Sequence, residues 1–159
     1  MLSLERSDIR IRTFAEGLFS KLAHDLELIC RDVTATVDGE TATLQIKVDR
    51  IAVAGAVKNG RVDPNVLSTS YCEEILAKMK REVFHGAANV EVTADRSKVV
   101  VKMNGKSVEK RLTTDGDQAR GVLELSLQAL GSHPVKGPMN AFRVKDRVEV
   151  HYDVAFKSG

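Results

Sequence analysis

The sequence predicts an all-β fold with one short helix, in the form of an antiparallel β-barrel of about eight strands. Apolar and polar residues alternate with period two along most of the chain, which is typical of strands with one buried face. Asp-Gly or Asn-Gly pairs at 38–39, 59–60, 104–105 and 115–116 are suited to the tight turns that join such strands. One stretch, 71–84, has helical spacing instead.

The strands are expected, in chain order, at 8–13, 41–49, 88–94, 97–103, 106–113, 120–129 and 147–156. Segment 25–38 also alternates, but its phase changes near Arg31 or Asp32. One extra residue at that point predicts a β-bulge, and bulges bend strands. Strongly bent strands favour closure into a barrel.

Two segments depart from the strand pattern. In 71–84, Ile75, Leu76, Met79 and Val83 form one apolar stripe, which predicts an amphipathic helix. Ser70 and Glu73 have the spacing of a capping box at its start, and Gly86 is a suitable stop. Segment 14–23 is shorter and contains Gly17, so it predicts one or two helical turns.

Length and composition indicate a single domain over residues 1–159. The net charge is only +2, which argues against a nucleic-acid partner. The first residues carry charges where a secretory signal would be apolar, and no apolar run is long enough to cross a membrane, so we expect a cytoplasmic protein. Cys30 and Cys72 are expected to be buried thiols. Two cysteines and four scattered histidines predict no metal site, and no cofactor is expected.

Three stretches carry a likeness to a known family. They are Leu22-Ala23-His24-Asp25-Leu26-Glu27-Leu28, the loop and helix at 60–68 and 74–83, and the ending at 127–146. In this order and spacing they resemble the YceI-like family of lipocalin-like β-barrels, which are associated with binding polyisoprenoids and other long-chain lipids. The chain departs from the family at Ala129-Leu130-Gly131-Ser132 and in a shortened 87–90, and many relatives are exported. The resemblance covers most of residues 8–155 and implies a lipocalin-like barrel.

The first functional hypothesis is non-enzymatic binding of a long-chain apolar ligand (a polyisoprenoid, quinone or fatty-acid derivative) inside the barrel. Each buried CH₂ group contributes about 0.8 kcal/mol to such binding. The candidate ligand-binding residues are Leu26, Leu28, Val99, Val101, Met103, Leu123, Leu125 and Leu127 on the strands, with Phe14, Phe19, Leu22, His24, Met139 and Phe142 near the mouths. The alternative is that these side chains fill a packed core. The protein would then be a structural or interaction module that forms a homodimer or binds a protein partner.

A few polar residues could contact a ligand or a membrane. His24 could donate a hydrogen bond to a head group, with Asp25 fixing its tautomer or capping the next loop, or it could be satisfied by backbone. Lys136, in the stiff loop 133–138, could meet an anionic head group, or the loop could be an ordinary corner. The basic helix face with Lys78, Lys80 and Arg81 is either solvated or makes transient membrane contact. The sequence shows no nucleophile elbow and no convincing carboxylate pair, so we expect no enzymatic activity.

Overall fold

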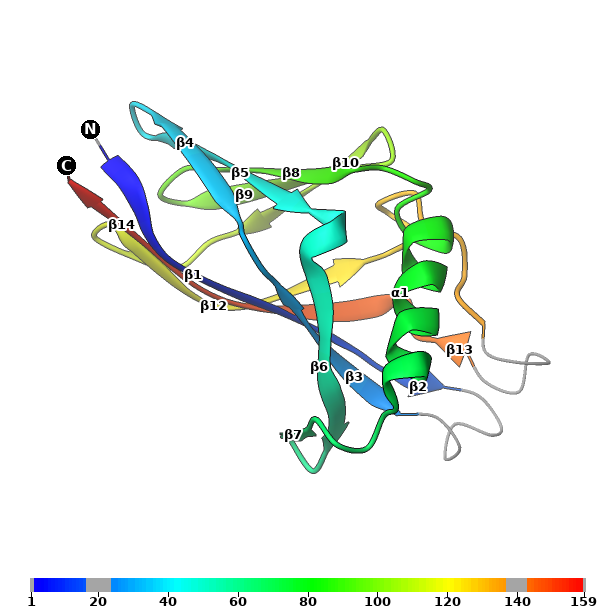
Figure 1. Ribbon diagram of the computed structural model, residues 1–159. Helices are drawn as coiled ribbons and strands as arrows, with labels where there is room; N and C mark the ends of the chain where they lie inside the picture. The colour runs from blue at the N-terminus through cyan, green and yellow to red at the C-terminus, as the bar shows by residue number, and fades with distance from the viewer. Residues whose placement is uncertain (1, 17–23, 137–142, 159) are drawn as a thin grey trace.

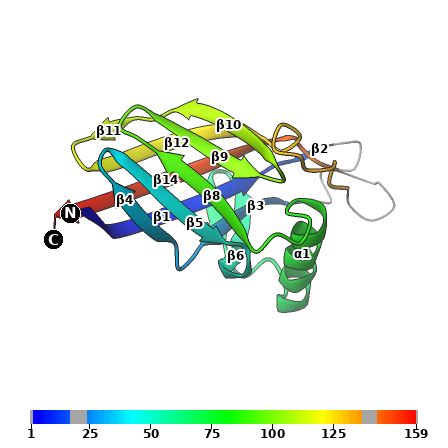
Figure 2. The same ribbon diagram turned by 90° about the horizontal axis from the view of Figure 1, so that it is seen from above.

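The computed structural model describes residues 2–16, 24–136 and 143–158. Two antiparallel sheets face each other, and one helix, α1 (Thr69–Glu82), stands at the end of the sheets opposite the chain termini (Figures 1 and 2). The predicted fold class, all-β with one short helix, is confirmed over these ranges. The third, smallest sheet pairs β2 (Ala15–Glu16) with β13 (Arg143–Val144).

The larger sheet has seven strands and the smaller has five. In spatial order the seven are β11 (Thr114–Asp115), β12 (Gln118–Ser126), β14 (Arg147–Ser158), β1 (Leu2–Thr13), β3 (Asp25–Cys30), β6 (Ile51–Lys58) and β7 (Arg61–Asp63). The five are β10 (Lys106–Arg111), β9 (Lys98–Met103), β8 (Asn89–Ala94), β5 (Thr41–Lys47) and β4 (Thr34–Asp38). A 3₁₀ turn, η2 (Val48–Arg50), leads from the smaller sheet back to the larger one.

The prediction that the strands close into a barrel is wrong. Within the described ranges no strand ladder joins an edge of one sheet to an edge of the other. The edge strands themselves explain this. β11 has only two residues and β7 only three. On β10, Lys106 and Lys110 share the face of Val108, which packs against the core, and charged residues on the inner face of an edge strand oppose further pairing.

The phase change in 25–38 does not mark a β-bulge. β3 ends at Cys30, Asp32 adopts a φ of 54°, and the chain then enters β4 in the other sheet. The alternation restarts because the buried face now belongs to a different sheet. A register shift does occur within β3, between Glu27 and Leu28, opposite Gly55 of β6.

The predicted turns are confirmed. Asn59-Gly60 and Asn104-Gly105 have positive φ at both residues and form two-residue turns between β6 and β7 and between β9 and β10. Gly39 and Gly116 likewise have positive φ, in the turns β4–β5 and β11–β12.

The helix is confirmed, but its start differs from the prediction. Ser68 is the N-cap, with extended backbone angles, and its Oγ accepts a hydrogen bond from the Tyr71 N–H at 3.1 Å. Ser70 already lies inside the helix, so the Ser70–Glu73 capping box does not form. At the other end, Gly86 has a φ of 79° and its N–H donates to the Lys80 carbonyl, as expected of a helix stop.

The prediction of helical turns over 14–23 is wrong for Ala15 and Glu16, which form the strand β2. Their backbone pairs with Val144 and Arg143 of β13. Residues 17–23 lie outside the described part of the chain.

Candidate functional site

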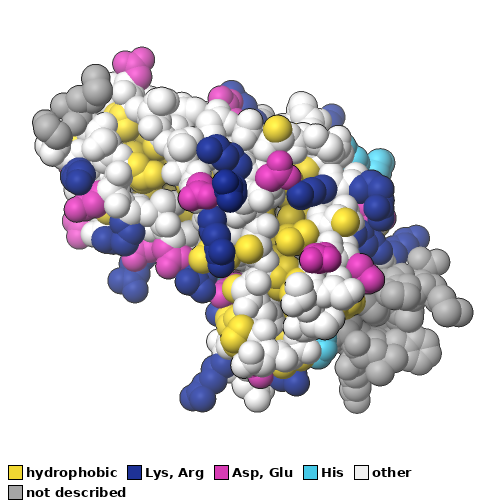
Figure 3. Space-filling view, in the orientation of Figure 1, with side chains coloured by type: hydrophobic (Ala, Val, Ile, Leu, Met, Phe, Trp, Pro, Cys, Tyr) yellow, Lys and Arg dark blue, Asp and Glu magenta, His cyan; other side chains and the backbone are white. Residues whose placement is uncertain are grey.

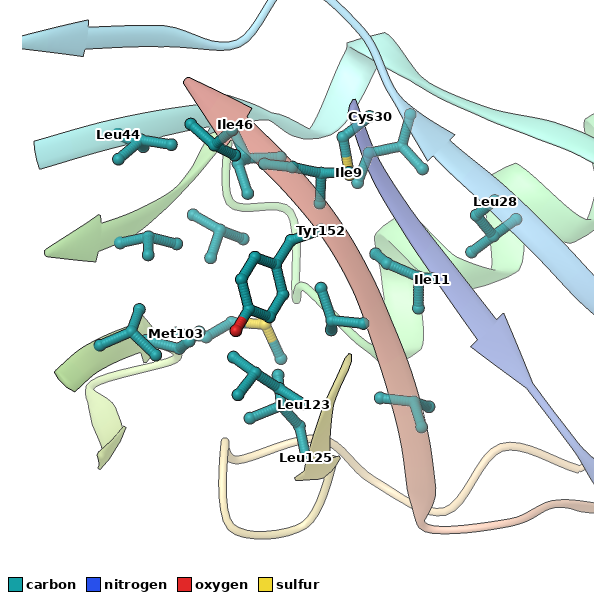
Figure 4. A pocket seen from close by; sticks show the side chains of 18 of the residues that line it. Ile9, Ile11, Leu28, Cys30, Leu44, Ile46, Met103, Leu123, Leu125 and Tyr152 are labelled. Carbon is teal, nitrogen blue, oxygen red and sulfur yellow. The ribbon is translucent and has the colours of Figure 1, made fainter. Parts of the chain in front are cut away.

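A cavity of about 510 Å³ lies between the two sheets. This volume is within the usual range of small-molecule sites, about 300–1,000 Å³. Successive side chains of a strand point to opposite faces, so the inner faces of both sheets bring rows of apolar side chains together (Figure 4). Apolar residues from each wall line it, among them Leu44, Ile46, Val90, Val99, Val101 and Met103 on the smaller sheet and Ile9, Ile11, Leu28, Leu123, Leu125 and Val150 on the larger.

Every described residue of the predicted ligand site lines this cavity. These are Phe14, His24, Leu26, Leu28, Val99, Val101, Met103, Leu123, Leu125 and Leu127. Phe19, Leu22, Met139 and Phe142 lie outside the described residues. The structure therefore brings the predicted strand residues to one surface, and their role in holding a ligand stays a prediction.

Two parts of the cavity wall lie outside the site predicted from the sequence. One is the inner face of β14, with Val148, Val150 and Tyr152, whose alternation was as clear as that of the strands that were included. The other is the inner face of α1, with Ile75 and Met79. The apolar stripe predicted that this helix packs on something, but its position at one end of the sheets depends on long-range contacts that no local pattern encodes.

Cys30 and Tyr152 bring polar atoms among the apolar side chains that line the cavity. Burial raises the pKa of the Cys30 thiol to about 12, so the thiol is uncharged at neutral pH. The Tyr152 hydroxyl lies beside Met103 and Leu123 in Figure 4 and accepts a long hydrogen bond, 3.5 Å, from the Thr113 N–H. The ring crosses Gly121 of β12, where a Cβ would approach the hydroxyl to 2.8 Å.

One end of the cavity, the α1 end, is lined by His24, Tyr71, Glu74, Lys78 and Lys136. The Lys78 ammonium donates a hydrogen bond to the Lys136 carbonyl, which links α1 to the segment after β12. Asp25 accepts a hydrogen bond from the Ala15 N–H at 2.9 Å. Its carboxylate therefore fastens β3 to β2, a role closer to the predicted backbone cap than to a partner for His24.

The opposite end, the turn end, is lined by Glu40, Asp95, Arg96 and Asp117. The Arg96 guanidinium donates to a Glu40 carboxylate oxygen at 2.6 Å, to the Gly116 carbonyl at 2.6 Å and to an Asp117 carboxylate oxygen at 2.9 Å. We call this set of contacts the Arg96 bridge. It connects turns of both sheets, because Arg96 and Glu40 belong to the smaller sheet's turns and Gly116 and Asp117 to the larger sheet's.

Among the described residues, no group of three or more His, Cys, Asp or Glu side chains is placed to hold a metal ion. The one helix in the described ranges is too short and too polar to cross a membrane. On the face shown in Figure 3, basic and acidic side chains are interspersed.

Comparisons with known proteins give a likeness of fold. No family model matches the sequence, and no curated protein matches it significantly. Among solved structures, the chain is similar to the crystal structure of Burkholderia cenocepacia BcnA, with a TM-score of 0.56 and 13% sequence identity over 96% of each chain. At this identity the similarity shows a shared fold and nothing finer.

Proposed function

We propose that this protein binds a long-chain apolar ligand, such as a polyisoprenoid, quinone or fatty-acid derivative, in the cavity between its two sheets, without catalysing a reaction. The observation that carries the proposal is the cavity itself, about 510 Å³ within walls of Val, Ile, Leu and Met side chains. Transfer of a hydrocarbon chain from water into such walls contributes about 0.8 kcal/mol per CH₂ group before the costs of ordering.

Two further observations support the proposal. Polar groups are concentrated at the ends of the cavity, as expected of a site for an amphiphile whose tail is buried. The fold is similar to that of BcnA, and the three stretches that resemble the YceI-like family include His24, Leu26 and Leu28, which line the cavity. We infer that the chain is a distant relative of that family. The alternative of an interaction module predicts an interior filled by side chains, so the cavity favours ligand binding.

Native mass spectrometry of protein purified without detergent tests the proposal. We expect a mass excess that disappears after extraction with organic solvent, and the extract should contain a chain amphiphile. Protein that carries no extractable ligand and takes up none from a lipid mixture would contradict the proposal.

A pair of neighbouring residues on β12 provides a matched test by substitution. Leu123 lines the cavity, whereas Val122 is 53% exposed on the outer face of the same strand. Leu123→Trp places a larger ring in the space that the ligand tail would occupy and should weaken ligand binding at least about tenfold, since such crowding costs about 1–3 kcal/mol. Val122→Trp adds the same group outside and should leave occupancy unchanged. Equal occupancy in the two folded variants would place the ligand elsewhere.

A further inference from the structure

The two ends of the cavity differ in charge. The α1 end has two ammonium groups, on Lys78 and Lys136, and one carboxylate, on Glu74. The turn end has three carboxylates and the single guanidinium of Arg96. A ligand with an apolar tail and a charged head group would therefore prefer one of the two possible orientations in the cavity.

The positive charge at the α1 end is weakly compensated. The hydrogen bond from the Lys78 ammonium to the Lys136 carbonyl brings the two lysines to the same mouth but neutralises neither. The carboxylate nearest to Lys78 is Glu82, one helical turn along α1, at 4.0 Å. Lys136 forms no ion pair with any residue in the described ranges, and it is exposed at the mouth. Both ammonium groups can therefore turn to an anion that stands between them.

The turn end has the opposite character. The Arg96 guanidinium already donates to Glu40, Asp117 and the Gly116 carbonyl. Its positive charge is therefore balanced by protein carboxylates and attracts an anionic ligand only weakly. Asp95 accepts hydrogen bonds from the backbone of Ser97 and Lys98, which lower its pKa and keep it ionised. An anionic group would be repelled here, and the Arg96 bridge spans the turns of both sheets at this end.

Given the apolar ligand proposed above, we propose that it is a single-chain amphiphile with an acidic head group. The head group lies at the α1 end between Lys78 and Lys136, and the tail extends to the Arg96 bridge. The cavity of about 510 Å³ is within the range of small-molecule sites, so the space between the α1 end and the Arg96 bridge limits the tail that it holds. A tail longer than this space would meet the Arg96 bridge.

Palmitate and hexadecanol separate the head-group claim from the proposed function, because they share a chain and differ in charge. With protein freed of ligand by solvent extraction, we expect palmitate to bind about tenfold more tightly at low salt, and this advantage to shrink at high salt. Equal affinities for palmitate and hexadecanol would contradict the acidic head group but would still be consistent with an apolar binding site. Binding of neither probe would contradict the proposed function as well. Hexadecyl phosphate, as a third probe, tells whether phosphate serves as well as carboxylate.

The two lysines can be tested against a third lysine of the same helix. Lys78→Gln and Lys136→Gln should each weaken palmitate binding about threefold to fivefold, the scale of a partly exposed ion pair, and leave hexadecanol binding unchanged. Lys80 pairs with Asp49 at 2.8 Å and does not line the cavity. Lys80→Gln should alter neither affinity. A loss of palmitate affinity as large in Lys80→Gln as in Lys78→Gln would show that net charge, and not the mouth, is responsible.

The limit on chain length is tested at the other end. Wild-type protein should bind docosanoate at least about tenfold more weakly than palmitate, because its longer tail would meet the Arg96 bridge. Arg96→Ala removes the bridge and should narrow this difference, and Glu40→Gln, which removes one contact, should do so partly. Arg120→Ala, on the outer face with a side chain 78% exposed, is the matched control. An unchanged length preference in both folded bridge variants would overturn the assignment of Arg96 as the limit.

Discussion

At the scale of single residues, the buried charge of Glu27 is the clearest energetic feature of the larger sheet. Its side chain is only 4% exposed on the face away from the cavity, and its two carboxylate oxygens accept hydrogen bonds from Arg10 and Arg12, each at 3.1 Å. Arg12 lies directly opposite Glu27 in the β1–β3 ladder. A buried carboxylate of this kind is retained only where its partners replace the lost water.

We expect Glu27→Ala to destabilise the fold by about 2–3 kcal/mol. Breaking a fully buried pair costs about 3–5 kcal/mol, but Arg10 and Arg12 are 40% and 24% exposed and recover some hydration. Urea denaturation measures the difference. Glu91→Ala removes the exposed pair with Lys102 and should change stability by less than about 0.5 kcal/mol. Similar losses in the two variants would contradict the special position of Glu27.

Cys30 offers a second prediction at this scale, from its raised pKa. With a pKa of about 12, the thiolate fraction at about pH 8 is on the order of 10⁻⁴, and the cavity also restricts access. Iodoacetamide should therefore modify the half-buried Cys72 of α1 well before Cys30, as peptide mass spectrometry would show. In urea the two should react at similar rates. Because the native state holds the Cys30 proton more firmly, this residue's contribution to stability is complete below about pH 9 and is lost as the pH rises towards 12.

At the scale of elements, the start of α1 is decided by which serine has extended backbone angles. Ser68 does, and its hydroxyl accepts the Tyr71 N–H. Ser68→Ala should cost about 1 kcal/mol in thermal or urea unfolding, the usual value for an N-cap. Ser70→Ala should cost much less, because Ser70 is already inside the helix. A larger loss of stability in Ser70→Ala than in Ser68→Ala would instead favour the capping box predicted from the sequence.

The elements also show what the sequence could and could not predict. The strands and turns were predictable because alternation and Asn-Gly pairs act locally, as at Asn59-Gly60 and Asn104-Gly105. The break at Asp32 was visible as a change of phase, but a bulge and a crossing between sheets leave the same local pattern. β2 could not be predicted from Ala15 and Glu16 alone, because its partner β13 is more than a hundred residues away in sequence.

At the scale of the whole molecule, the inner surface was largely predictable and its ends were not. Alternation placed Val99, Val101 and Leu123 on inner faces, and the structure gathers them around one cavity. The Arg96 bridge combines three turns that are distant in sequence, and nothing around Arg96 in the chain signals Glu40 or Asp117. Closure of the barrel was expected from general rules for β-proteins, but the short edge strands β7 and β11 end the sheets instead.

In the ranges that the structure describes, no ladder joins the two sheets. The width of the cavity can therefore change more easily than its length. Where the two walls move apart, side-chain packing loosens but no backbone hydrogen bond of either sheet has to break. The cross-section can thus adapt to a kinked, unsaturated or methyl-branched tail without breaking a ladder hydrogen bond. The cavity cannot lengthen in the same way, because a guanidinium connects the hairpin turns at one of its extremities.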